Sequence, residues 1–213
     1  MGSNGPARAG GIGVGPIAFQ DQERALKRTW LIVLVVAVVV VAGYLWMRQG
    51  ETGDGSLDLV EAFRAAEKRT PMDPSAAFSM EPQTIQGETK PAIYAHPPSR
   101  IIYHDVKVPP HARLELFLGL KEEAWPKGTD GVYFRVGVSY GDTYKDLVTR
   151  NVDPFRVAGD RGWVPISIDL SEYAGKTVNV IFNTHESLPG LPPHSMYDYA
   201  VFGAPRLVVV PQS

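Results

Sequence analysis

The sequence lacks cysteine and lacks any excess of positive charge. Its 213 residues contain no Cys, which excludes disulfide bonds, thiolate zinc sites, iron–sulfur clusters and a cysteine nucleophile. Lys and Arg number 21 against 23 Asp and Glu, so the formal net charge is −2. Nucleic-acid binders usually carry a basic face. We therefore expect no nucleic-acid partner.

Motifs of catalysis and metal binding are also missing. The sequence has no HExxH pair. Residues 137–141 (GVSYG) match G-x-S-x-G, but they end a predicted strand with no helix after it and so do not form a strand–helix nucleophile elbow. The run 11–15 (GIGVG) follows no predicted strand, so it fails as a dinucleotide-binding loop. His185 and His194 fall in one predicted loop, but no close metal pair is evident among the histidines. We predict a protein that is not an enzyme and has no cofactor.

The sequence does contain one long apolar run. Trp30–Met47 (WLIVLVVAVVVVAGYLWM) has no charged residue and makes about 27 Å of helix, close to the hydrocarbon thickness of a bilayer. Trp30, Tyr44 and Trp46 are expected to anchor the two membrane interfaces. Because no small-residue cleavage pattern follows the run, we predict a retained transmembrane helix over 30–47, with the lipid bilayer as its partner.

Charges beside this run predict its orientation. Arg24, Lys27 and Arg28 precede it. Arg48 follows it, and then come the acidic residues Glu51, Asp54, Asp58 and Glu61. Basic flanks stay in the cytoplasm. We expect a single-pass protein of a bacterial inner membrane, with a cytoplasmic N-terminus and a periplasmic C-terminal domain.

Two segments flank the predicted span. Residues 1–29 are interpreted as a cytoplasmic Gly-rich tail followed by a short helix. Residues 48–91 are interpreted as a linker with an amphipathic helix over 57–69, capped by Ser56. We expect this helix to dock on the membrane, on a partner or on the following domain.

From residue 92 onward, short strands replace helical periodicity. In 131–140, Val132, Phe134 and Val136 alternate with other side chains at the period of a half-buried strand. The chain leaves no room for the crossover helices of a parallel sheet. We therefore predict a mainly β protein in which 92–213 form a two-sheet antiparallel β-sandwich. The predicted strands are 100–108, 113–120, 131–140, 164–170, 177–183 and 199–210.

The motifs of this region resemble a known class of domain. They are 113–120 (RLELFLGL), 130–134 (DGVYF), 162–163 (GW), 169–175 (DLSEYAG) and 198–205 (DYAVFGAP). Together they resemble the jelly-roll, galactose-binding-like and carbohydrate-binding modules of bacterial envelope proteins, over roughly residues 93–210. The resemblance implies a sugar site on a loop or sheet face with exposed aromatics and acids, and it leaves open a structural calcium ion. It assigns no binding residue in this chain.

Candidate contact residues come from aromatic and apolar side chains near predicted loops. Exposed rings suit either sugar stacking or a protein interface. The segment 185–197 (HESLPGLPPHSMY) is rich in Pro and apolar enough to dock on a partner. The candidates for partner or glycan contacts are Trp125, Tyr140, Tyr144, Leu188, Leu191, Met196 and Tyr197.

Two functions remain open at this point. The first is a non-catalytic accessory subunit of a larger membrane complex, such as a respiratory or photosynthetic one, with other membrane proteins as partners. It accounts for the Gly-rich tail and the linker as well as the domain. The alternative is a membrane-tethered carbohydrate-binding module of the cell envelope, with a glycan as partner.

Overall fold

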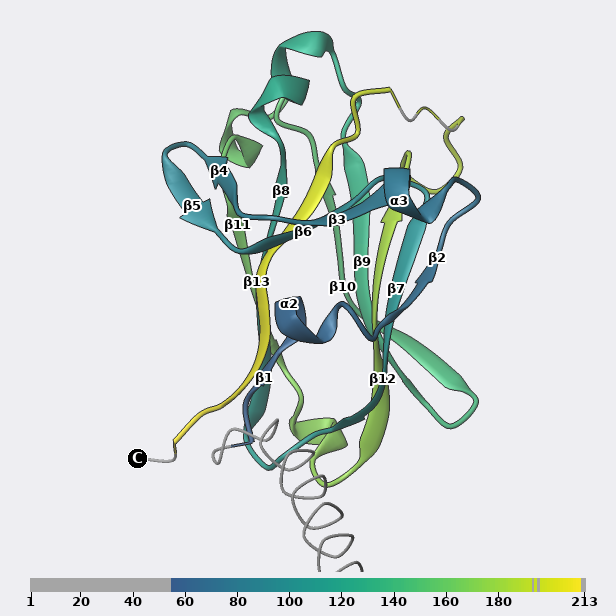
Figure 1. Cartoon of the computed structure of the whole chain (residues 1–213), viewed down its shortest axis with the longest axis vertical. Coiled ribbons are helices and arrows are strands. Elements are labelled where there is room, and N and C mark those ends of the chain that lie inside the picture. The colour runs from purple at the N-terminus through teal and green to yellow at the C-terminus, as the bar shows by residue number, and fades with distance from the viewer. Residues whose placement is uncertain (1–54, 193, 195, 212–213) are drawn as a thin grey trace, which may run out of the picture. The chain divides into compact units, whose positions relative to one another are not determined.

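Alternating apolar residues give this chain two large antiparallel sheets (Figure 1). The computed structural model describes residues 55–192, 194 and 196–211. One sheet has the order β11-β8-β13-β6-β3, and β1 also pairs with β13. Its strands are β11 (Val164–Asp169), β8 (Ala112–Leu120), β13 (Ala200–Val209), β6 (Ala92–Ala95), β3 (Phe78–Met80) and β1 (Leu57–Asp58).

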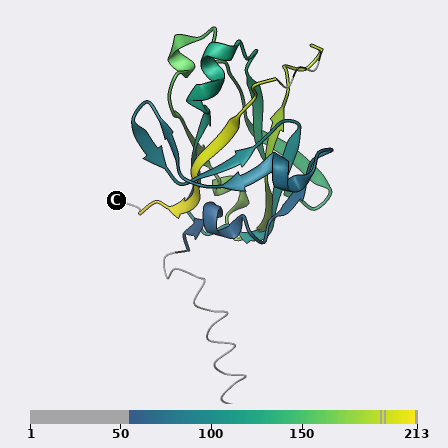
Figure 2. The same cartoon turned by 45° about the horizontal axis from the view of Figure 1, so that its top comes forward.

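The second sheet has the order β10-β9-β12-β7-β2. Its strands are β10 (Thr143–Val152), β9 (Val132–Tyr140), β12 (Thr177–His185), β7 (Ser99–Lys107) and β2 (Glu67–Arg69). A separate hairpin of β4 (Gln83–Ile85) and β5 (Glu88–Lys90) lies beside β8 and β11 (Figures 1 and 2). It is held there because the Trp163 indole donates a 2.9 Å hydrogen bond to the carbonyl of Glu88.

The two sheets bury a common core. Phe202 of β13 packs against Phe182 of β12, with ring centroids 4.9 Å apart, and against Phe134 of β9 at 5.3 Å. All three side chains are fully buried. Burying such aromatic groups supplies much of a domain's stabilisation. The predicted mainly β domain of antiparallel sheets is thus confirmed, and most predicted strands lie within one or two residues of their observed bounds.

Helices are short in the described residues. They are α2 (Leu59–Ala62), α3 (Pro74–Ala77) and the 3₁₀ turns η1 (Glu122–Lys127), η2 (Ala158–Asp160) and η3 (Ser171–Tyr173). The predicted helix over 57–69 is therefore wrong. Asp58 rather than Ser56 caps α2, accepting from the amide of Val60 at 2.7 Å. An isolated helix of this length has little stability in water. Pairing β2 with β7 instead gives backbone groups of 67–69 hydrogen-bond partners.

The sandwich also begins earlier than residue 92. Strands β1, β2 and β3 pair with β13, β7 and β6, respectively. Much of the segment expected to be a linker over 48–91 is therefore part of the sheets.

Among the described residues, no helix is long and apolar enough to cross a bilayer. The predicted span 30–47, its anchors Trp30, Tyr44 and Trp46, and the tail 1–29 all lie outside the described residues.

Candidate functional site

A row of polar side chains crosses the five-stranded sheet. Because strand residues alternate between faces, the neighbours of the buried Phe134 and Phe182 point away from the core. The strand register then aligns one such residue from each strand. From β2 to β10 this row is Arg69, Arg100, Asn183, Arg135 and Thr149. We call these five residues the polar row.

Hydrogen bonds fix the centre of the polar row. The Arg100 Nε donates to Asn183 Oδ1 at 2.7 Å. The Asn183 amide donates to the Tyr144 hydroxyl at 3.4 Å and to the carbonyl of Arg135 at 3.5 Å. Asn183 is only 2% exposed. Because the Asn183 amide is buried and hydrogen-bonded on both sides, it holds Arg100 and Tyr144 in fixed positions.

Asp146 connects the other end of this network. Its carboxylate accepts from Arg135 Nη2 at 2.7 Å and from the Tyr144 hydroxyl at 2.5 Å. Burial disfavours the ionised form, but these hydrogen bonds outweigh it and lower the pKa of Asp146. Burial, together with the hydrogen bond to Asp146, raises the pKa of Tyr144 to about 12. At neutral pH the site therefore holds a carboxylate, a guanidinium and a neutral phenol.

His185 stands where two concavities meet. The arginine pocket, of about 340 Å³, is lined by Arg69, Arg100, Thr184 and His185 among others. The tyrosine pocket, of about 260 Å³, is lined by Tyr133, Arg135, His185, Ser187 and Pro189. Burial and the nearby Arg135 and Arg100 lower the pKa of His185, so its ring is neutral at pH 7. Its buried Nε2 has no hydrogen-bond partner among the described residues, which is unusual for a buried polar atom.

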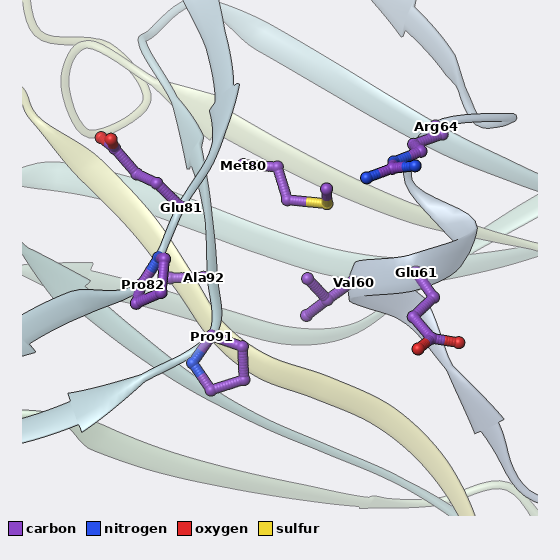
Figure 3. Close-up of a pocket in the computed structure, with 8 residues that line it drawn as sticks. All are labelled: Val60, Glu61, Arg64, Met80, Glu81, Pro82, Pro91 and Ala92. Carbon is purple, nitrogen blue, oxygen red and sulfur yellow. The ribbon is translucent and has the colours of Figure 1, made fainter.

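A third concavity, the α2 groove, lies between α2 and strands β3 and β6. It measures about 480 Å³, and Figure 3 shows its apolar floor of Val60, Met80 and Ala92. Arg64 and Glu61 lie on the α2 side, and Glu81 lies on the opposite side of Met80 with its carboxylate directed away from them. Glu81 is already engaged by Lys121 at 3.2 Å. The α2 groove thus offers apolar surface with few converging polar groups.

The sequence-predicted contact residues are dispersed. Tyr144, 38% exposed, joins the network beside the polar row. Tyr140, 49% exposed, lies at the end of β9, where the Lys176 ammonium sits 4.9 Å from its ring centroid. Trp125 instead packs on the core and donates to the carbonyl of Leu120 at 3.0 Å.

The remaining candidates belong to the loop between β12 and β13. Leu188, Leu191 and Met196 are exposed by 40%, 58% and 57%. Tyr197 packs edge-on against Tyr199, with ring centroids 6.4 Å apart. Their roles in binding stay predictions.

Sequence reasoning missed most of the polar row. Arg100, Asn183 and Arg135 lie far apart in the chain and meet only through the strand register. The sequence did contain a signal for Arg135. Buried residues alternate along 131–140, so the residues between them, including Arg135, point away from the core. His185 and His194 were considered together as metal ligands, and the described residues contain no metal-binding group of three or more such side chains.

No family model matches the sequence. An uncharacterised protein of Archaeoglobus fulgidus is 32% identical over 130 residues, which are 58% of this chain and 32% of that protein. The chain thus spans about a third of the length of this curated relative.

Among solved structures, carbohydrate-binding modules are similar in fold. The CBM51 of Clostridium perfringens GH95, in complex with methyl-galactose, is 17% identical with a TM-score of 0.38, covering 72% of this chain and 99% of that one. CBM51-2 of C. perfringens ZmpB, in complex with GlcNAc, is 13% identical with a TM-score of 0.44 over 72% of this chain and 31% of that one. A β-1,3-glucan-binding CBM6 of Bacillus halodurans is 13% identical with a TM-score of 0.40 over 72% and 92%, respectively. These neighbours have the sandwich fold that the sequence motifs resemble.

Proposed function

We propose that the sandwich is a glycan-binding module whose ligand lies across the outer face of the five-stranded sheet. The observation that carries this proposal is the polar row, in which Arg100, Asn183 and Arg135 are held side by side on three neighbouring strands. Their positions are fixed by hydrogen bonds within the face. A preformed array of this kind binds without first ordering its side chains.

The chemistry of the face suits a sugar. Sugar hydroxyls both donate and accept hydrogen bonds, and amide, guanidinium and carboxylate groups present two such partners in one plane. Tyr133 lies opposite His185 across β9 and β12, with ring centroids 6.1 Å apart. Aromatic rings of this kind supply flat apolar surface beside a polar edge. The combination fits the alternating C–H and hydroxyl surfaces of a saccharide.

The predicted span adds a location to this proposal. A helix over 30–47 tethers the sandwich to a membrane, and the basic residues Arg24, Lys27 and Arg28 orient the sandwich outward. We infer a tethered module at the outer side of a bacterial cytoplasmic membrane. The role that we propose for it is to bind its ligand without changing it.

Glycan binding by the full chain tests the proposal. The chain, kept in mild detergent, is applied to an array of neutral and acidic envelope glycans. We expect binding by the wild type and at least about tenfold weaker binding by Tyr144→Ala, because that variant removes a ring and a hydroxyl from the face. Phe155→Ala is the control, since Phe155 is an exposed aromatic residue outside the polar row and its network. A folded wild-type chain that binds none of the glycans contradicts the proposal.

The accessory-subunit function is the second candidate, and one observation favours it. Leu188, Leu191 and Met196 expose large apolar side chains on one loop, and clustered apolar exposure often marks a protein interface. If this loop docks on a membrane protein, the native chain co-purifies with that protein in fixed proportion. Leu191→Ser with Met196→Ser should abolish co-purification. Recovery of the native chain as a free monomer contradicts this candidate.

A further inference from the structure

We propose that the ligand of the polar row is an acidic glycan whose carboxylate binds in the arginine pocket. This inference rests on the proposed glycan-binding function and adds the chemical class of the ligand. It follows from an uncompensated charge, a free donor set and the different character of the neighbouring tyrosine pocket.

The first argument is the juxtaposition of two guanidinium groups. Arg69 and Arg100 are direct partners in the β2–β7 register, where Cα atoms lie about 5 Å apart. Like charges directly opposite on neighbouring strands are destabilising. Arg69 contacts Glu67, which also accepts from His104 at 2.7 Å. Arg100 has no ion pair with any carboxylate of the described residues. Because Glu67 offsets Arg69, the uncompensated charge of this pair is that of Arg100, and a bound ligand anion neutralises it.

The second argument is the set of donors left for a ligand. Arg100 uses its Nε on Asn183, and its two terminal nitrogens have no partner among the described residues. A guanidinium edge of this kind matches a carboxylate with two parallel hydrogen bonds. His185 also lines this pocket. None of the residues described as lining the arginine pocket is acidic.

The third argument is the contrast between the two pockets. Arg135 faces the tyrosine pocket, but Asp146 neutralises it through a 2.7 Å ion pair. Arg100 and Arg135 are separated by the one strand β12, so their backbones lie about 10 Å apart. The face therefore has a cationic end and a near-neutral end. We assign the acidic sugar to the arginine pocket and its neutral neighbour to the tyrosine pocket.

Paired ligands test this assignment. Uronic-acid oligosaccharides are compared with their carboxyl-reduced twins, which keep the same linkages but are neutral, and with sulfated glycans. Binding to the full chain in mild detergent is measured by calorimetry at fixed ionic strength. We expect each bound acid to bind at least about tenfold tighter than its twin. Arg100→Gln should remove this difference, and Arg100→Lys should restore only part of it, because an ammonium lacks the planar fork.

A matched control separates the pocket from diffuse charge. Arg64→Gln removes the same charge from the α2 groove and should leave the preference for acids intact, with melting temperatures confirming that all variants fold. If Arg64→Gln weakens binding as much as Arg100→Gln, the assignment to the arginine pocket is wrong. If the acids and their carboxyl-reduced twins bind equally, or if only sulfated glycans bind, the ligand does not bind through a carboxylate. Glycan binding itself is still supported in both cases. Binding of no glycan at all overturns the proposed function itself.

Discussion

Tyr144 covers Gly137 on the outer face of the five-stranded sheet. A Cβ at Gly137 would lie 2.5 Å from the Tyr144 hydroxyl oxygen, 2.7 Å from its ring and 2.6 Å from the backbone carbonyl oxygen of Lys145. The missing side chain thus lets the ring lie close to β9, where its hydroxyl reaches both Asp146 and Asn183. Tyr144 owes its place in the site to a glycine on the neighbouring strand.

Gly137→Ala should therefore displace the Tyr144 ring. A strand backbone accepts alanine, so the damage comes from the clash, and we expect a loss of about 1–3 kcal/mol of unfolding free energy together with weaker glycan binding. Denaturant unfolding and calorimetric titration measure the two effects. Gly159→Ala is the control, because nothing lies within 4 Å of a Cβ at that position. Unchanged glycan binding by Gly137→Ala would show that Tyr144 takes no part in the site.

Asp146→Asn should alter stability in acid. The pKa of Asp146 is lowered in the folded state, so its contribution is present above its unfolded value of about 3.9 and is lost as pH falls through the folded pKa. We expect the variant to be about 1–3 kcal/mol less stable at pH 7 and to lose less on acidification below about pH 4. Melting curves from pH 2 to 7 measure this. Asp142→Asn, which changes an exposed turn residue, is the control and should behave as the wild type. If the melting temperatures of Asp146→Asn and the wild type fall equally as the pH is lowered, the prediction is wrong.

The sequence predicted the core strands well because their buried residues alternate. β9 buries Val132, Phe134 and Val136 in the expected pattern. β10 was not predicted, since it is an edge strand in which only Val152 is buried, and such a strand leaves little periodicity in the sequence. The charged residue Asp153, which follows β10, is buried and forms a 3.0 Å ion pair with Arg156.

The polar row was beyond sequence reasoning for a different reason. Local alternation indicates which residues of a strand point outward, but the alignment of Arg100 with Asn183 depends on pairing across 83 positions. Strand register is set by the whole buried pattern. A site formed by register therefore needs the fold before its residues can be grouped.

The predicted orientation is tested with protease added to spheroplasts, in which the outer membrane no longer shields the periplasmic face. We expect cleavage or release of the sandwich from outside, because the basic flank 24–28 keeps the N-terminus in the cytoplasm. Immunoblotting with a C-terminal tag measures the loss of signal, and a cytoplasmic protein serves as the lysis control. If the tag survives in spheroplasts and is lost only after the inner membrane is permeabilised, the orientation is wrong and the glycan would have to be intracellular.

Asp198→Asn should stabilise the sandwich in alkali. The Asp198 side chain is fully buried, it accepts one hydrogen bond from Thr129 at 2.9 Å, and its Oδ2 has no partner among the described residues. Burial, with Asp130 and Glu186 nearby, raises its pKa to about 8. Between about pH 4 and 8 the folded chain keeps a proton that the unfolded chain has lost, so stability falls as pH rises and the penalty is complete above about 8. We expect the wild-type melting temperature to drop by several degrees between pH 5 and 9, at about 2–4 °C per kcal/mol, and the variant to show a flatter profile. Asp142→Asn should keep the wild-type slope, and an equal slope in Asp198→Asn would mean that another group is responsible.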